Sequence, residues 1–399
     1  MVRLWTAMVL AIPLLASAGC GWFGDETALE ADFETDPLAA GWTLESRPFG
    51  SAVGQWAEGG VAGSRCLSVA EGYWQSPAVS AEPLSYWRVR FRSQATEEGR
   101  FSAVFLDAAG EPLPAACYDS IYAPTHWEAT EICVRVHAEA TGLRLRFEAA
   151  GAAVAVDDVL LERAEAADVS AWADAVYAGL PPVAYEPPAD RHAYLPRTMA
   201  ALASGGPLRV VVLGDSIAND LSDSLFEALA ARRWPGARME VVTSVRSGTG
   251  CEFYREGDRM REYALRFGPD LVMIAGISHG CDAEAVRDCI RQVRAAGDAD
   301  VWVLSGAVTP LEWMQGAMAE RSGLSPAVMG DLLRAWPERL AAVCRDERVE
   351  YLDLRSAWEA YVASSPRPRA WYQRDAVHAN ARGKQVLGRI VSAYMAPRG

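Results

Sequence analysis

After residue 207 the sequence alternates short apolar, β-branched runs with longer stretches of helical character. The short runs are 208–213, 239–245, 270–275, 300–304 and 349–354. The intervening stretches include 217–232, 283–296 and 326–345. Strands that alternate with helices form a parallel sheet with helices on both faces. The pattern therefore predicts an α/β domain over residues 208–399.

The chain before this domain has a different pattern. From about residue 29 to 163, short runs alternate polar and apolar residues and are separated by Gly, Pro and Asp; examples are 86–91, 101–106, 143–147 and 154–159. Alternation with a period of two, punctuated by turn residues, predicts an antiparallel β-sandwich. Residues 164–207 hold a short helical piece and two Pro-Pro pairs, so we expect a connector there.

The N-terminus has the pattern of an export signal. Arg3 precedes an apolar run over 4–15, and Ala16, Ser17, Ala18, Gly19 and Cys20 follow. The run is too short for a stable transmembrane helix. A signal peptide over 1–19 would leave Cys20 for lipid attachment, as in bacterial lipoproteins, whereas cleavage after Ala18 would release a soluble protein. We favour the lipid-anchored form in the cell envelope over a secreted or periplasmic one.

The net charge and the cysteines of the chain indicate which binding partners, metal sites and disulfides to expect. The net charge of −14 argues against nucleic acid or an anionic membrane surface, so a lipid anchor is the expected membrane contact. The eight cysteines show no zinc-type spacing. Export permits disulfides, and Cys251 with Cys281 is the first candidate pair because both lie just past motifs expected to meet.

Gly214-Asp215-Ser216 follows the first strand run and opens a helical stretch. In an open parallel sheet, ligands gather beyond the carboxyl ends of the strands. Ser216 would then lie at a helix N-terminus, where N–H groups and the helix dipole favour developing negative charge. Asp215 or Ser216 could equally be a simple helix cap, so this motif alone does not establish a nucleophile.

Asp375 and His378 lie between the last strand run and a closing helical stretch, 381–394. A carboxylate three residues before an imidazole can reach its Nδ1 and leave Nε2 to take a proton from serine. Of the five histidines, His279 and His378 fall in the α/β region. Together these motifs predict a triad with Ser216 as nucleophile, His378 as base and Asp375 as the orienting acid.

At these positions the chain resembles the SGNH (GDSL-type) hydrolase family, from about residue 208 to the C-terminus. The matching blocks are Gly-Asp-Ser-Ile at 214–217, the loop 245–250, and 375–380 with Gly383. The resemblance implies a three-layer α/β/α sandwich with the flavodoxin-like strand order 2-1-3-4-5. It also implies ester hydrolysis without a metal or other cofactor, with the N–H groups of Ser216 and Gly248 in the oxyanion hole.

One block departs from the family pattern. Where the family has Gly-x-Asn-Asp, this chain has Gly-Ile-Ser-His-Gly, so Ser278 replaces the asparagine that donates to the oxyanion. Either Ser278 donates through its hydroxyl, or Asn219 or Arg246 substitutes, or catalysis is weakened. Arg246 could instead hold a substrate carboxylate or cap its loop. His279 could bind substrate or be an ordinary loop residue.

The β-rich region weakly resembles a carbohydrate-binding jelly roll. Its aromatic residues could form a platform for sugars, although such side chains more often belong to a core. They are Trp74, Trp87, Trp127, Tyr73, Tyr86, Tyr118 and Tyr122. Glu30 with Asp32, and Asp157 with Asp158, resemble carboxylates that hold a structural calcium in such modules, and solvated turn acids are the alternative.

These features favour an exported esterase that removes acyl groups, above all O-acetyl, from a polysaccharide or oligosaccharide through an acyl-enzyme. An acyl-chain lipase or thioesterase is the enzymatic alternative, and the tryptophans of the α/β region could line its pocket. They are Trp313, Trp336, Trp358 and Trp371. A glycan-binding lipoprotein with a decayed hydrolase domain is the non-enzymatic alternative, against which the complete triad argues.

Overall fold

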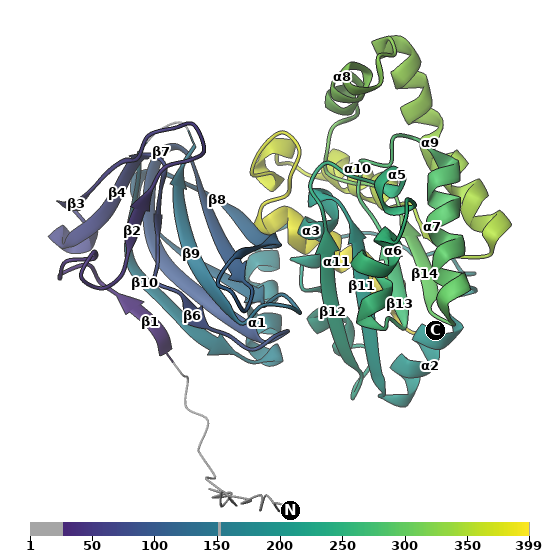
Figure 1. Cartoon of the computed structure of the whole chain (residues 1–399), viewed down its shortest axis with the longest axis horizontal. Helices are drawn as coiled ribbons and strands as arrows, with labels where there is room; N and C mark the ends of the chain where they lie inside the picture. Colours follow the sequence, from purple (N-terminus) through teal and green to yellow (C-terminus); the bar gives the residue numbers. More distant parts are fainter. Residues whose placement is uncertain (1–26, 151–152, 399) are drawn as a thin grey trace, which may run out of the picture.

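The structure is a computed structural model that describes residues 27–150 and 153–398, with the side chains of 96–98 and 122–125 left out. The export signal and Cys20 lie outside these residues. An N-terminal β-rich part and a C-terminal α/β part lie side by side (Figure 1). Within the described residues, no helix combines the length and apolar character needed to cross a membrane.

The α/β part contains a five-stranded sheet in which every neighbouring pair is parallel. Its spatial order is β12 (Arg238–Val245), β11 (Pro207–Gly214), β13 (Leu271–Ile274), β14 (Asp300–Leu304) and β15 (Glu350–Leu352). In chain order this is 2-1-3-4-5, so the predicted fold class is confirmed.

Successive side chains of β11 point to opposite faces of the sheet, which explains why helices cover both faces. Val210 and Val212 pack into one cluster with the helices on one face of the sheet, whereas Val211 and Leu213 pack into another with the helices on the opposite face. Side chains on a strand point to opposite faces in turn, so both faces of this apolar strand need a helical cover. The helices are α1 (Ala166–Ala178), α2 (Pro196–Ser204), α3 (Ser216–Ser222), α4 (Phe226–Ala231), α5 (Cys251–Tyr254), α6 (Arg259–Tyr263), α7 (Ala283–Ala296), α8 (Leu311–Ser322), α9 (Pro326–Glu347), α10 (Leu354–Ser364) and α11 (Ala381–Met395), with 3-10 turns η1 (Val61–Gly63), η2 (Leu265–Phe267) and η3 (Arg369–Tyr372).

The N-terminal part is antiparallel throughout, as predicted. Its strands are β1 (Thr27–Ala31), β2 (Thr43–Glu45), β3 (Val53–Glu58), β4 (Arg65–Glu71), β5 (Tyr73–Gln75), β6 (Val79–Ser80), β7 (Tyr86–Leu106), β8 (Pro112–Arg135), β9 (Gly142–Ala149) and β10 (Val154–Ala164). The long strands β7 and β8 shift register where they bend, which lets β7 pair with β10 in one half and β9 in the other. Phe91, Phe101 and Phe147 pack together between these halves.

Buried polar contacts join the two parts. Trp172 of α1 donates to the carbonyl of Glu131 on β8 at 2.8 Å. Arg135 at the end of β8 forms an ion pair with Glu227 of α4, and both side chains are almost fully buried. The 164–207 segment contains α1 and α2, and both helices pack on the α/β part.

Burial bears on two of the alternatives left open for the β-rich part. Trp74 and Trp87 are 4% and 5% exposed, so they belong to the core rather than to a sugar platform. Asp157 is fully buried and accepts from the N–H of Val61 and the hydroxyl of Ser64. The described residues contain no cluster of three or more acidic, His or Cys side chains able to hold a metal; structural calcium stays a prediction.

The predicted Cys251–Cys281 disulfide is wrong for this structure. All seven described cysteines are free and buried. Cys251 instead lies against Cys289 of α7, whose thiol donates to the Cys251 carbonyl at 3.6 Å. Both expected partners lie near the sheet edge, but α5 turns Cys251 towards α7.

Candidate active site

Ser216 lies at the carboxyl edge of the sheet, where β11 ends and α3 begins. The turn between them requires glycine, because a Cβ on Gly214 would come within 2.1 Å of the Ala275 carbonyl oxygen. Asp215 caps α3 by accepting from the N–H groups of Ile217 and Ala218 at 2.9 and 3.4 Å. The helix N-terminus therefore carries a serine that is held at a fixed position and is partly open to solvent.

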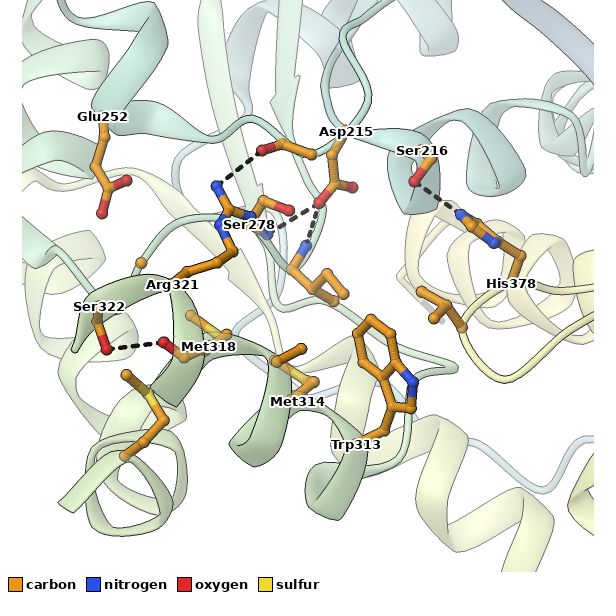
Figure 2. A pocket seen from close by; sticks show the side chains of 16 residues that line it. Asp215, Ser216, Glu252, Ser278, Trp313, Met314, Met318, Arg321, Ser322 and His378 are labelled. Carbon is orange, nitrogen blue, oxygen red and sulfur yellow. Dashed lines mark hydrogen bonds between the residues drawn. The ribbon is translucent and has the colours of Figure 1, made fainter. Parts of the chain in front are cut away.

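His378 connects this serine to Asp375. Its Nε2 lies 2.8 Å from the Ser216 hydroxyl, and its Nδ1 lies 2.9 Å from both carboxylate oxygens of Asp375 (Figure 2 shows the Ser216–His378 bond). Side-chain exposure is 22% for His378 and 32% for Asp375. With Nδ1–H donated to the carboxylate, Nε2 is left to accept the serine proton.

Asp375 is held in its charged form. Burial alone would raise the pKa of this carboxyl, but the hydrogen bond and charge of His378 outweigh burial. The N–H groups of Val377 and His378 also donate to Oδ1, at 2.8 and 2.9 Å. The pKa of Asp375 therefore lies well below its usual range, and a charged acceptor faces the imidazole near neutral pH.

Asp215 does more than cap a helix. Its second oxygen accepts from the N–H groups of Ile277 and Ser278 at 3.0 and 2.9 Å (Figure 2). This buried carboxylate therefore ties the serine-bearing helix to the loop after β13. The sequence around Asp215 indicates the capping role alone, because the contact with Ile277 and Ser278 depends on two neighbouring strands ending side by side.

Replacing Asp215 by Ala should cost about 2–4 kcal/mol of unfolding free energy, since the buried N–H donors of α3 and the partly buried ones of the loop after β13 lose their acceptor. Asp282 offers a matched control: it caps α7 through two N–H groups, both at 3.0 Å. Asp282→Ala should cost about 1 kcal/mol, the usual loss of a helix cap. Urea unfolding of both variants measures the difference, and equal costs would contradict the second role of Asp215.

The residues predicted to form the oxyanion hole line one cavity. Gly248 and Ser278 line the same cavity as Ser216 and His378. The N–H of Ser278 already donates to Asp215. Its hydroxyl is therefore the Ser278 group that can reach a negative oxygen in the cavity.

The three predicted substrate residues do not line this cavity. Asn219 is buried, and its amide donates to the Ala116 carbonyl of β8 at 2.9 Å. Arg246 is exposed and places its guanidinium 4.5 Å from the ring centre of Phe253. His279 is 1% exposed. In this structure Asn219 and His279 therefore do not reach the cavity, and the roles expected of Arg246 stay predictions.

Most of the cavity wall has no counterpart among the residues predicted from the sequence. The cavity measures about 610 Å³, and a face of α8 supplies one side of it. That face carries Trp313, Met314, Ala317, Met318, Arg321 and Ser322 (Figure 2). Positions 314, 318 and 321 share one helical face, a spacing that could have indicated the wall but is equally typical of a core. Trp358 lies in the core and does not line this cavity.

Two charged side chains border the cavity. Arg321 donates to the Gly248 carbonyl at 3.2 Å, which places a cation beside the expected oxyanion loop. Glu252 of α5 lies on the same side (Figure 2). Burial and the nearby Asp282 raise the pKa of Glu252, against the opposing effect of Arg321.

One protein family matches most of the α/β part of the chain. Residues 212–386 match the model of the GDSL-like Lipase/Acylhydrolase family. The C-terminal part of the chain is therefore similar to GDSL-like hydrolase domains, as its motifs predict. No curated protein sequence matches the chain at a significant level.

Solved structures similar to parts of the chain are distant. Tailspike protein 4 of bacteriophage CBA120 is 16% identical, with a TM-score of 0.28, and the match covers 33% of this chain and 20% of that protein. A catalytic mutant of Axe2, an acetylxylan esterase from Geobacillus stearothermophilus, is 12% identical, with a TM-score of 0.38 and coverage of 47% and 94%. The xylan-binding domain CBM22-1 of Paenibacillus barcinonensis Xyn10C is 13% identical, with a TM-score of 0.28 and coverage of 36% and 97%.

Proposed function

We propose that the protein is a serine esterase that removes acyl groups, foremost O-acetyl, from carbohydrate. The observation that carries the enzymatic part is the continuous contact from Ser216 through His378 to Asp375 beside a cavity. Nucleophile, base and orienting acid within hydrogen-bond reach of one another are what acyl transfer requires.

The reaction has two halves. Ser216 Oγ bonds to the ester carbonyl carbon while its proton passes to His378 Nε2, and the oxyanion accepts hydrogen bonds from Ser216 N–H, Gly248 N–H and the Ser278 hydroxyl. The carbon–oxygen bond to the alcohol then breaks, and His378 returns the proton to the departing alcohol. Water attacks the acyl-enzyme with His378 again as base, the carboxylic acid leaves, and Ser216 regains its proton.

The carbohydrate part rests on the architecture. A cavity of about 610 Å³ has room for much more than an acetyl group, so a bulky alcohol fits beside the acyl carbon. Trp313 is 44% exposed on its wall and offers a flat apolar face. A β-sandwich is packed on the hydrolase domain through buried contacts, as an accessory module for a polymeric substrate would be.

An acyl-chain hydrolase is the second candidate, favoured by a specific observation. Met314, Met318 and Met329 form an apolar side of the cavity. Methionine adapts readily to flexible apolar ligands, so this wall would also suit a longer acyl chain.

Acetate release from acetylated glycans should exceed hydrolysis of p-nitrophenyl palmitate, each compared by kcat/KM with the Ser216→Ala variant as blank. Met318→Lys should weaken long-chain hydrolysis more than acetate release, because an ammonium in the apolar wall opposes an alkyl chain. A preference for palmitate in the unmodified protein would replace the carbohydrate proposal by the acyl-chain one. Serine-independent binding of glycan without turnover would favour the decayed-hydrolase alternative.

Ser278→Ala should lower kcat for p-nitrophenyl acetate by about 10²-fold, because one oxyanion donor is lost, and should leave KM nearly unchanged. Ser278→Asn supplies the amide of the family pattern and should recover part of that loss. Steady-state kinetics on the three proteins measures both effects. An unchanged kcat in Ser278→Ala would mean that another group holds the oxyanion.

Export and lipid attachment through Cys20 belong to this proposal as well. They place the hydrolase at the cell envelope, where a polysaccharide substrate is accessible, and they depend on the signal motif at 1–20.

A further inference from the structure

Asp220 lies one helical turn after Ser216 on α3, so it is fixed to the same rigid element as the proposed nucleophile. Its side chain is fully buried. One oxygen accepts from the Arg374 guanidinium at 2.6 Å, and the other accepts from the N–H of Ala379 at 2.8 Å. Asp220 therefore binds the residues on either side of the segment that holds Asp375 and His378.

Arg374 closes the same segment from the other direction. Its Nη1 also donates to the Ala379 carbonyl at 2.7 Å, and its backbone N–H donates to the His378 carbonyl at 3.0 Å. The guanidinium is 6% exposed. Residues 374–379 thus form a short loop whose two ends are held together by one buried ion pair.

The β-sandwich covers this ion pair. The ring of Tyr118 on β8 lies 5.5 Å from the Arg374 guanidinium. The neighbouring Asp119 accepts from the N–H of Ala381 at 3.1 Å, where α11 begins. Water is thereby kept from the pair, which restricts the conformations open to the loop.

Stability alone is a weak reason for such a pair. Desolvating two charges costs several kcal/mol, and apolar replacements of both partners are often neutral or stabilising. An apolar pair cannot form directional hydrogen bonds. It offers no acceptor for the Ala379 N–H and no donor for the Ala379 carbonyl. An apolar replacement would therefore remove the hydrogen bonds that set the path of the loop beside His378.

We propose that Asp220 and Arg374 are positioning residues that hold His378 Nε2 at hydrogen-bond distance from Ser216. Asp220 fixes the position of the loop relative to the helix that carries the nucleophile, and Arg374 fixes the residues around His378. This inference rests on the proposed function of Ser216 and His378. Misplacement by about 1 Å can cost about 10²-fold in rate, so the pair matters for catalysis even where the fold tolerates its loss.

The decisive variant removes both charges, Asp220→Asn with Arg374→Met, because a single replacement would leave an unpaired buried charge and endanger folding. The double variant should keep a near-native Tm and a KM within about twofold, while kcat falls about 10²-fold. Arg374→Lys keeps the charge and should retain more activity than the double variant. The matched control removes another buried pair, Arg135→Met with Glu227→Gln, and should leave kcat within about twofold.

A second readout separates this inference from the proposed function. The proton on His378 Nδ1, donated to Asp375, should give a downfield ¹H NMR signal that His378→Ala removes. In the double variant this signal should broaden or vanish. An unchanged signal together with wild-type kcat overturns the positioning role, as does a kcat loss no greater than that of an equally destabilised control. Absence of Ser216-dependent turnover in the wild type, with the signal still sensitive to the double variant, refutes the esterase and leaves the positioning role standing.

Discussion

Ser216→Ala should lower kcat for p-nitrophenyl acetate by about 10⁴-fold or more, with little change in KM. The hydroxyl forms the covalent bond to the substrate. It also supplies the proton that His378 Nε2, 2.8 Å away, accepts in the first half-reaction. Alanine removes the Oγ atom, which forms the bond and then carries the acyl group. The cavity that determines binding keeps its shape. Initial rates at saturating ester, corrected for spontaneous hydrolysis, measure the effect.

Ser222→Ala serves as the control, since Ser222 lies at the other end of α3, is buried and shares a hydrogen bond with Thr243 at 2.6 Å. It should remain active within a few-fold. If Ser216→Ala kept wild-type turnover, the nucleophile would have to be sought elsewhere in the domain.

Asp375→Asn should reduce kcat by about 10⁴-fold although the side chain keeps its shape. An amide can still accept from the N–H groups of Val377 and His378, but its NH₂ group faces Nδ1 where a carboxylate oxygen accepted the proton. The imidazole then favours the tautomer with hydrogen on Nε2, which cannot take the proton of Ser216. Retention of more than about a tenth of the activity would show that Asp375 does not set the tautomer.

The same substitution has a consequence for acid stability. Because the pKa of Asp375 is lower in the folded than in the unfolded chain, its charge stabilises the fold above the unfolded value of about 3.9. That stabilisation is lost as the pH falls towards the folded value. The difference in Tm between wild type and Asp375→Asn should therefore shrink as the pH is lowered from about 6 to below about 3.

The features that the sequence predicts well are those determined by residues close together in the chain. Features that depend on contacts between distant segments are harder to predict. Val210 to Leu213 are apolar at successive positions because both faces of β11 are covered, and such runs indicate a parallel sheet without further information. Asp375 and His378 meet through one turn of backbone, so their pairing is local. Their meeting with Ser216 spans 162 positions and follows from the rule that strand ends share one edge.

The remaining site depends on packing between distant elements. Asparagine is a residue type that often binds ligands, but β8 of the sandwich covers Asn219. No local sequence pattern indicates that contact. His279 is drawn inward because its Nδ1 accepts from the N–H of Cys251 at 3.3 Å. The methionines of α8 carry the spacing of an ordinary amphipathic helix, and only the neighbouring loops turn that face into a cavity wall.

The contacts between the sandwich and the α/β part also depend on packing between distant elements. Sequence patterns indicate a separate binding module, whereas the structure places Tyr118 and Asp119 against the elements that carry Arg374 and Ala381. The β-rich part therefore contributes to the environment of the loop 374–379.

The most direct test of Ser216 as an activated nucleophile is labelling with a fluorophosphonate, followed by peptide mass spectrometry. The reaction forms an Oγ–P bond, expels fluoride and passes the serine proton to His378, so it requires the same activation as ester hydrolysis. One phosphonyl group on the peptide that holds Ser216, with labelling at least about 10²-fold slower in His378→Ala, is the expected result. Absence of labelling in the folded protein, or a label on a different residue, would contradict the assignment of Ser216 and His378.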